Sequence, residues 1–274
     1  MAYYDSTRSA LAYAERGMPK LKSELSSDEL ITRQKALVTM SDLMHSTERV
    51  HEAVKCGCLL QIIQLLNDKD ETIRFKSISV LKTVLQHTVG RDAFLTKHDG
   101  YNDLIQLFTD DSIKIRLRAF EAMQTLTTVP YFARVIASRG LCQKLVQEHL
   151  SKVEPDLQEN SESLNVILQV LEIVHQLLFE NCPEINNNIK NPEEELEKQK
   201  NNDLEALNAF SNLLDHSNSS IKSGACVTLH DLCANSPAAK NVASLSEKII
   251  PTLCKLLKSA DKQVQKAPEI DLKK

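Results

Sequence analysis

The chain has 274 residues, a formal net charge of −4, and 42% hydrophobic against 26% charged residues, which is a soluble globular composition. It contains only six glycines, about 2% against a usual ~7%, and no tryptophan. Because tight turns, hairpins and phosphate-binding loops need glycine, and sheets concentrate aromatic residues, we expect neither a sheet-rich nor a nucleotide-binding fold. The composition predicts an all-α chain with short connections, and its acidic balance disfavours nucleic-acid binding.

Targeting and redox features are sparse. The first residues, Met-Ala-Tyr-Tyr-Asp-Ser, lack the apolar core of a secretory signal, and no stretch approaches ~18 uninterrupted apolar residues. We therefore expect no membrane span and no membrane partner. The odd number of cysteines, without secretory spacing, predicts reduced thiols in the cytoplasm. These cysteines are Cys56, Cys58, Cys142, Cys182, Cys226, Cys233 and Cys254.

Residues 1–17 are polar and fit no repeated pattern, so we interpret them as an N-terminal arm. Its adjacent aromatic residues Tyr3 and Tyr4 are the candidate partner-binding residues of the arm. Residues 18–180, in contrast, carry a pattern that recurs about every 42 residues and divide into four units. We predict that each unit folds as a small group of helices.

Three glycines mark the repeated pattern. Gly57, Gly100 and Gly140 lie 43 and 40 residues apart, and each opens an apolar run with helical spacing. A polar turn follows the first of these runs, where Asp70 is expected to cap the next helix through its side-chain oxygen. A small residue then recurs at one position of that helix, where closely packed helices leave little volume. These small residues are Ala36, Ser77, Ala119 and Ala225.

The second half of the chain continues the pattern after an interruption. Residues 181–203 are polar and low in complexity, and we interpret them as a surface loop or insertion that runs into a charged helix start at Asn191-Pro192. Residues 204–267 carry a fifth unit and part of a sixth, which Pro268 is expected to interrupt. Residues 268–274 form the C-terminal tail. Five to six units of about 42 residues predict a right-handed helical solenoid of the armadillo or HEAT class.

The sequence offers little chemistry. It lacks the glycine-rich phosphate-loop and dinucleotide motifs, the H-E-x-x-H zinc motif and the G-x-S-x-G nucleophile elbow. Cys56-Gly57-Cys58, with His45 and His51 upstream, matches no zinc spacing, and we interpret both cysteines as packing residues. We therefore expect no catalytic residue, no metal, no cofactor and no small-molecule substrate. An enzyme with a thiol or metal site is the least favoured alternative.

Basic side chains cluster on the predicted third helix of the first three units, which lines the concave groove of armadillo-like proteins. An acidic partner segment could bind this strip through charge-assisted hydrogen bonds. The alternative is that the recurrent arginines at 33, 74 and 116 pair with an acidic residue of the neighbouring unit. The candidate groove residues are Arg74, Lys76, Lys82, Arg116 and Arg118, and the same helices also carry Arg33, Lys35 and Lys114.

The armadillo proteins that carry nuclear-import cargo bind peptides with a ladder of Trp and Asn residues. This chain has no tryptophan and carries Val38, Ser79, Glu121 and Val227 at the equivalent position. Cargo import of that kind is therefore not expected.

Two runs of sequence resemble a known family. Residues 30–37, Leu-Ile-Thr-Arg-Gln-Lys-Ala-Leu, followed by Asp42-Leu43-Met44-His45 and preceded by the Met-Pro-Lys-Leu of 18–21, look like the first repeat of the radial spoke head protein 14 family of cilia and flagella. Residues 87–95, His-Thr-Val-Gly-Arg-Asp-Ala-Phe-Leu, are similar to the segment that closes its second repeat. The resemblance is strong over about residues 17–150 and weaker afterwards, where the interruption at 181–203 and the stop at Pro268 depart from the family.

The resemblance implies a non-catalytic structural subunit of the axonemal radial spoke, located in the cytoplasm and cytoskeleton of the cilium or flagellum. Its implied partners are other stalk, neck and head proteins of the spoke and axonemal proteins associated with the doublet microtubules. The alternative hypothesis is a general cytosolic armadillo adaptor that binds short linear peptide motifs.

Overall fold

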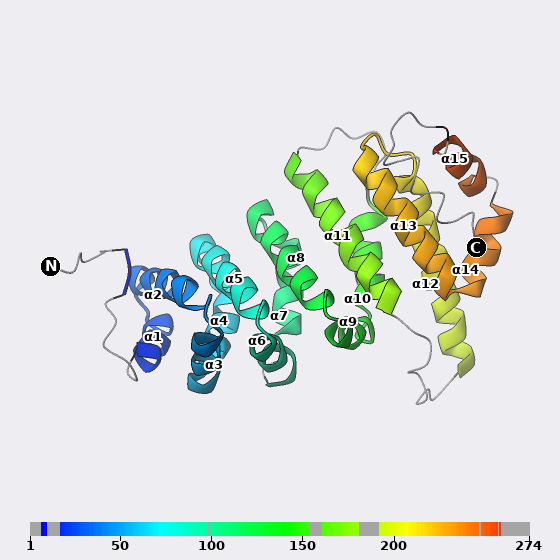
Figure 1. Cartoon of the computed structure of the whole chain (residues 1–274). Helices are drawn as coiled ribbons and strands as arrows, with labels where there is room; N and C mark the ends of the chain where they lie inside the picture. The colour runs from blue at the N-terminus through cyan, green and yellow to red at the C-terminus, as the bar shows by residue number, and fades with distance from the viewer. Residues whose placement is uncertain are drawn as a thin grey trace. The chain divides into compact units, whose positions relative to one another are not determined.

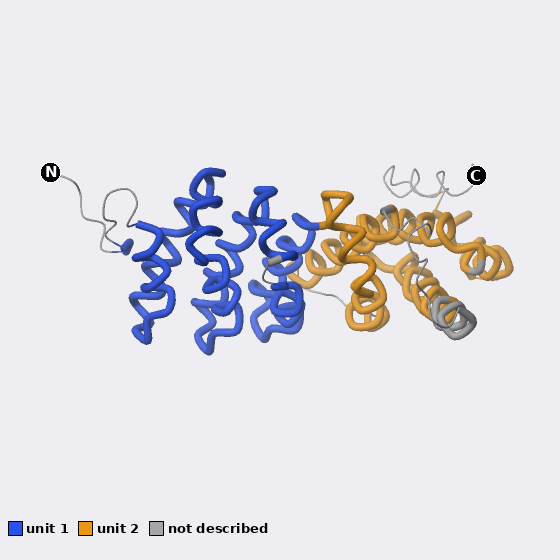
Figure 2. The backbone as a smooth tube through the Cα atoms, turned by 90° about the horizontal axis from the view of Figure 1, so that it is seen from below, with its two compact units in different colours: residues 1–126 blue, residues 127–274 orange. Residues whose placement is uncertain are grey.

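The computed structural model describes residues 7–9, 17–97, 99–153, 161–180, 192–246, 248–256 and 258. Every regular element in these ranges is a helix (Figure 1). The chain divides into two compact units, Met1–Leu126 and Thr127–Lys274 (Figure 2). Tyr3, Tyr4 and the predicted tail at 268–274 lie outside the described residues.

Unit 1 is a stack of helical repeats. It begins with a helix pair and continues with two groups of three helices, and the middle helix of each group ends in a 3₁₀ turn. The pair is α1 (Gly17–Leu25) and α2 (Leu30–Leu43). The first group is α3 (Thr47–Cys56), α4 (Cys58–Gln64) with its turn Leu65–Asn67, and α5 (Glu71–Leu85). The second is α6 (Thr88–Asp92) with a π-helical turn Ala93–Lys97, α7 (Tyr101–Gln106) with its turn Leu107–Thr109, and α8 (Ile113–Thr127).

Unit 2 is also built from helical repeats, but they are less regular than those of unit 1. A three-helix group comes first: α9 (Pro130–Ala137), α10 (Leu141–Leu145) with a π-helical turn Val146–Leu150, and α11 (Ser161–Glu180). One long helix, α12 (Pro192–Leu213), then precedes α13 (Ser219–Asn235). The last described helices are α14 (Pro237–Leu245) and α15 (Ile249–Leu256). The predicted polar loop at 181–203 is thus helical from Pro192 onwards, since proline is favoured in a first helical turn; residues 181–191 lie outside the description.

The predicted helix starts are confirmed at the three glycines and at Asp70. Gly57, Gly100 and Gly140 each directly precede a helix. Gly57 and Gly140 have φ of +79° and +77°, the left-handed region that favours glycine. Gly100 is needed for another reason, because a Cβ there would lie 2.4 Å from the ring of Phe94. Asp70 Oδ1 accepts a hydrogen bond from the Ile73 amide at 3.0 Å.

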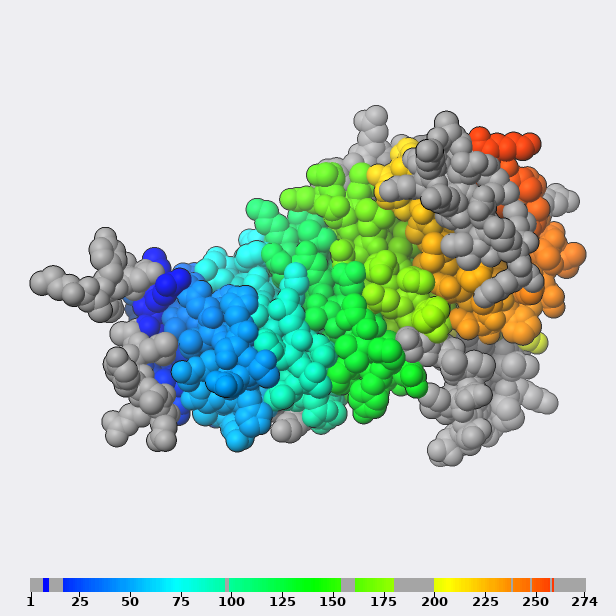
Figure 3. Space-filling view, in the orientation of Figure 1, coloured from blue at the N-terminus to red at the C-terminus, as the bar shows by residue number. Residues whose placement is uncertain are grey.

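The core of unit 1 lies between successive repeats, which follow one another as bands of colour in the space-filling view (Figure 3). α2 packs against α5, and the ring of Phe108 stacks on that of Phe120 at 4.2 Å between centroids. The predicted small-residue position is fully buried in both units, as close helix packing requires. Its members are Ala36, Ser77, Ala119 and Ala225.

α11 is the most apolar long helix of unit 2. By length and composition alone, its segment Ser161–Phe179 is sufficient to cross a membrane. In the structure it packs against α9 and α13, and one of its faces is buried, whereas Phe179 near its end is exposed. Core helices of compact proteins meet the same criterion, so this is weak evidence for a membrane. The buried set includes Ile167, Val170, Leu171, Ile173, Val174 and Leu177.

Candidate functional site

The exposed face of the third helices in unit 1 is the candidate partner surface. Spacings of 41 and 42 residues place Lys35, Lys76 and Arg118 at one register position of α2, α5 and α8. Lys82 lies two turns further along α5, and all four side chains are half-buried. Lys114 is exposed near the start of α8. We call these five residues, Lys35, Lys76, Lys82, Lys114 and Arg118, the basic stripe.

Arg74 does not belong to this stripe, because its guanidinium is used inside unit 1. Its Nε and Nη2 donate to the two carboxylate oxygens of Asp110 at 2.7 and 3.2 Å, a two-pronged pair between neighbouring repeats. Its Nη1 donates to the carbonyl oxygens of Asp68 and Lys69. The hydrogen bond to Asp110 raises the pKa of Arg74, so the side chain stays charged.

The same bond pattern recurs at Arg33 and Arg116. Nη1 of Arg116 donates to the carbonyl oxygens of Asp110 and Asp111, at 2.7 and 3.3 Å. Nη1 of Arg33 donates to those of residues 27 and 28, and its Nε forms an ion pair with Asp68 at 3.3 Å without hydrogen-bond alignment. For Arg33 and Arg74 the structure thus supports pairing with the neighbouring repeat. Arg74 and Arg116 thus fasten the turn before their own helix, and their predicted part in a partner groove stays a prediction.

Lys82 and Arg118 meet at a single carboxylate. Lys82 Nζ and Arg118 Nη1 donate to the same oxygen of Glu121, Oε2, at 2.8 and 2.7 Å. The Arg118 guanidinium also lies 5.9 Å from the ring centroid of Phe75, within cation–π range. We call this group, Phe75 and Lys82 on α5 with Arg118 and Glu121 on α8, the α5–α8 seam. It contains two cations and one anion in half-buried surroundings.

The equivalent seam between α2 and α5 lacks the carboxylate. One repeat earlier, Lys76 takes the register position of Arg118 and Ser79 takes that of Glu121. The Ser79 hydroxyl donates back to the carbonyl of Phe75 at 2.8 Å. Among the described residues, Lys35, Lys76 and Lys114 form no ion pair within 4.0 Å. These three lysines are therefore the part of the stripe with uncompensated charge.

In unit 2, a histidine–aspartate pair connects α11 and α13. The His175 ring on α11 is 2.5 Å from Asp231 Oδ2 on α13, and His230 lies 3.3 Å from the other oxygen of the same carboxylate. The hydrogen bond to Asp231 raises the pKa of His175, assisted by the negative charge of Glu172 and opposed by partial burial. This pair therefore binds a proton more readily than a free histidine.

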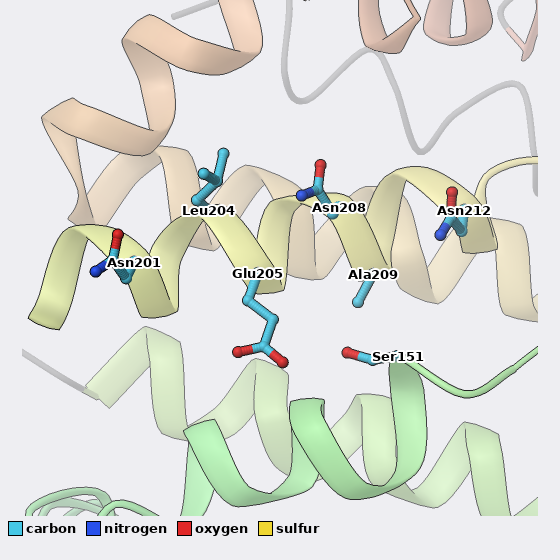
Figure 4. A pocket seen from close by; sticks show the side chains of 7 residues that line it. All are labelled: Ser151, Asn201, Leu204, Glu205, Asn208, Ala209 and Asn212. Carbon is cyan, nitrogen blue, oxygen red and sulfur yellow. The ribbon is translucent and has the colours of Figure 1, made fainter.

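A polar hollow of about 320 Å³ lies on another side of unit 2, between the end of the turn at 146–150 and the exposed face of α12 (Figure 4). Amide side chains dominate its wall, and Glu205 is the titratable group among its described lining residues. Glu205 already accepts a hydrogen bond from Gln147 at 2.8 Å. The lining residues are Ser151, Asn201, Leu204, Glu205, Asn208, Ala209 and Asn212.

Two of the thiols, Cys58 and Cys142, lie in surroundings that favour the protonated form. Cys58 is buried, its Sγ lies 3.5 Å from the carbonyl of Met18, and burial raises its pKa to about 11. Burial also raises the pKa of Cys142 to about 12. A thiol with such a pKa is protonated near neutral pH and is a poor nucleophile or metal ligand. Within the described ranges, no group of three or more His, Cys, Asp or Glu side chains is placed to hold a metal ion.

Comparison with known proteins relates part of the chain to a radial spoke protein. No protein-family model matches the sequence. Radial spoke protein 14 of Chlamydomonas reinhardtii is 32% identical over 107 residues, which are 38% of this chain and 27% of that protein. The matched region thus spans about a quarter of the length of this curated relative.

Solved structures share the fold over nearly the whole chain. A computationally designed armadillo repeat protein for modular peptide recognition matches with a TM-score of 0.70, at 20% identity, over 93% of this chain and 98% of that one. A designed armadillo repeat protein in complex with the peptide (KR)4 matches with a TM-score of 0.69, at 19% identity and the same coverage. The chain is therefore an all-α armadillo-type repeat protein, and part of its sequence is similar to radial spoke protein 14.

Proposed function

We propose that this chain is a non-catalytic scaffold of the axonemal radial spoke, where it mediates protein–protein contacts that support ciliary or flagellar motility. The observation that carries the proposal is the 32% identity to radial spoke protein 14 over 107 residues. The armadillo fold supports it, because repeat stacks present extended surfaces suited to binding other proteins. The partners would be other spoke proteins and axonemal proteins associated with the doublet microtubules, at the ciliary axoneme.

The basic stripe is the surface that we assign to a spoke partner. Lys35, Lys76 and Lys114 carry charge that no acidic group in the described chain neutralises. Lys35 and Lys76 are half-buried, so they lose less water on binding than a fully exposed lysine such as Lys114. An acidic, extended segment of a spoke protein would fit this face in charge.

Mass spectrometry of salt-extracted axonemes tests the proposed location. The chain should co-purify with spoke stalk and head proteins and be absent from spoke-less axonemes. Its presence only in the soluble cytoplasm, including that of cells without cilia, would exclude the axonemal role.

A charge-reversal pair tests the surface. Lys35→Glu combined with Lys76→Glu should reduce co-purification with spoke proteins, while thermal unfolding changes little, since surface substitutions usually stay within ±0.5 kcal/mol. The matched control is Lys55→Glu, which reverses an exposed lysine on α3 away from the stripe. Equal assembly of both variants would show that the stripe is only a solvated face.

A second candidate is a general adaptor that binds short linear motifs. Its support is that a structural neighbour, a designed armadillo protein, binds the peptide (KR)4. That peptide is basic, whereas the stripe here is itself basic, so an adaptor role would require acidic motifs. A pulldown that returns many unrelated clients, rather than one fixed complex, would favour this candidate.

A further inference from the structure

We infer that the α5–α8 seam is a carboxylate-binding site that Glu121 fills from within the chain, and that an acidic residue of a bound partner segment takes the place of Glu121. This inference rests on the proposed function of the basic stripe as a partner surface. It goes further by naming the group that is recognised and the residue that competes for it.

The geometry of the seam is that of a two-donor anion site. Lys82 and Arg118 come from neighbouring repeats, yet both donate to one oxygen, Glu121 Oε2, at 2.8 and 2.7 Å. Charge-assisted bonds of this length are among the stronger hydrogen bonds in proteins. The Arg118 guanidinium lies over the ring of Phe75, within cation–π range. The two cations would stay together around any carboxylate that reached the same position.

Glu121 is a replaceable occupant. Its side chain and that of Lys82 are about one-quarter exposed, and that of Arg118 about one-third, so solvent and a ligand both reach the pair. Two cations around one anion also leave a net positive charge. A partially exposed pair of this kind contributes modestly to stability, so a competing carboxylate has little to overcome.

The seam between α2 and α5, one repeat earlier, can be compared with the α5–α8 seam. At the α2–α5 seam, Ser79 replaces Glu121, Lys76 replaces Arg118, and Ser41 stands where Lys82 stands one repeat later. That seam therefore carries one cation and no carboxylate, and we call it the open seam. Successive third helices lie about 8–10 Å apart, a distance that an extended peptide covers in about three residues. One acidic segment could therefore reach both seams, the open one directly and the closed one by displacing Glu121.

The partner class is an extended acidic peptide. Carboxylates are favoured over a phosphorylated side chain because the site already holds a carboxylate at two-donor distance. Nucleic acid, the other polyanion, is disfavoured because single strands bind by stacking successive bases on aromatic rings, and the seam contains one ring, Phe75, with the Arg118 guanidinium over it.

Fluorescence anisotropy on the full chain tests the inference. The probe is a labelled peptide of alternating glutamate and serine, about ten residues long, which spans both seams. Glu121→Gln should bind it about 3- to 10-fold more tightly than the wild type, because the amide frees Lys82 and Arg118 from their anion. Ser79→Glu should weaken binding by a similar factor, because it closes the open seam over Lys76.

A control variant distinguishes an effect at the seam from the effect of removing one negative charge anywhere on the chain. Glu52→Gln removes one negative charge from an exposed pair with Arg49 on α3 and should leave affinity unchanged. Glu121→Gln keeps an acceptor oxygen, and its unfolding temperature shows whether it folds. The same peptide carrying phosphoserine in place of glutamate, and a single-stranded oligonucleotide, should gain less from Glu121→Gln; a larger gain for either would overturn the assignment to a carboxylate.

Failure of the inference is distinguishable from failure of the proposed function. If Lys35→Glu with Lys76→Glu abolishes peptide binding while Glu121→Gln and Glu52→Gln both bind like the wild type, the stripe is a partner surface but Glu121 is not a stand-in. If the double lysine variant and Glu121→Gln both leave peptide binding and axonemal assembly unchanged, the stripe itself is not the partner surface.

Discussion

In unit 1 the third helices α5 and α8 are joined by Lys82, Arg118 and Glu121, whereas in unit 2 α11 and α13 are joined by His175 and Asp231. The two pairs of helices differ in the polar side chains that connect them. Lysine, arginine and glutamate keep their charge throughout the physiological pH range, while histidine changes its charge near neutrality. Unit 1 therefore offers a permanent basic surface, and unit 2 a joint that responds to protons.

The two units also differ in how closely their backbones approach, which gives the largest expected effect. In unit 1 a Cβ on Gly90 would lie 2.1 Å from the carbonyl oxygen of Val84. In unit 2 a Cβ on Gly224 would meet only the Leu171 side chain, at 3.2 Å. Gly90→Ala should cost about 3 kcal/mol of unfolding free energy, because the backbone of α5 or α6 must move.

Gly224→Ala is the matched variant. Alanine favours the helix by up to ~1 kcal/mol, and a small shift of Leu171 offsets part of that gain, so the net change should stay within about 0.5 kcal/mol. Urea unfolding monitored by circular dichroism measures both variants. Equal destabilisation by the two substitutions would show that the backbone approach at Gly90 is no tighter than the side-chain contact at Gly224.

The second prediction concerns the arginine that fastens unit 1. Arg74→Met removes a mostly buried, two-pronged pair and leaves Asp110 without its partner. We expect a loss of about 2–3 kcal/mol, since an uncompensated, mostly buried carboxylate is costly. Lys69→Met, which changes an exposed lysine in the same turn, should change stability by less than about 0.5 kcal/mol. Similar losses in both would contradict the assigned role of Arg74.

The local signals in the sequence predicted the helices and their starts. Glycine before a helix and Asp70 as a cap depend on neighbouring residues alone, and the structure confirms them. The apolar stripes and the small-residue position follow from helical periodicity, which also fixed the register of Arg33, Arg74 and Arg116. Residues that interact only after the repeats stack were harder to assign.

Glu121 illustrates the limit. Its register position was recognised, but its contact with both Lys82 and Arg118 depends on the stagger of α5 against α8, which no local pattern records. His175 and Asp231 were missed as a pair for the same reason, since they are 56 residues apart. An acidic residue at a groove position, opposite a basic one a unit earlier, is the signal that could have found Glu121.

The smallest expected effect tests the proton-sensitive joint of unit 2. Asp231 raises the pKa of His175 in the folded chain above its ordinary value of 6.5. The stabilisation is therefore complete below about pH 6.5 and is lost as the pH rises through the folded pKa. His175→Gln should thus lose more unfolding free energy at acidic than at alkaline pH. The difference should be less than about 1 kcal/mol, because the ring is one-third exposed.

An NMR titration of His175 in wild type and in Asp231→Asn measures the pKa shift directly. Glu172 on its own helix and Asp231 on α13, the two groups that raise the pKa of His175, remain in His175→Gln, so the difference between its pH dependence and that of the wild type reports the loss of His175. A pKa that is the same with and without Asp231 would show that the two units do not differ in this way, and that the contact between α11 and α13 is insensitive to protons.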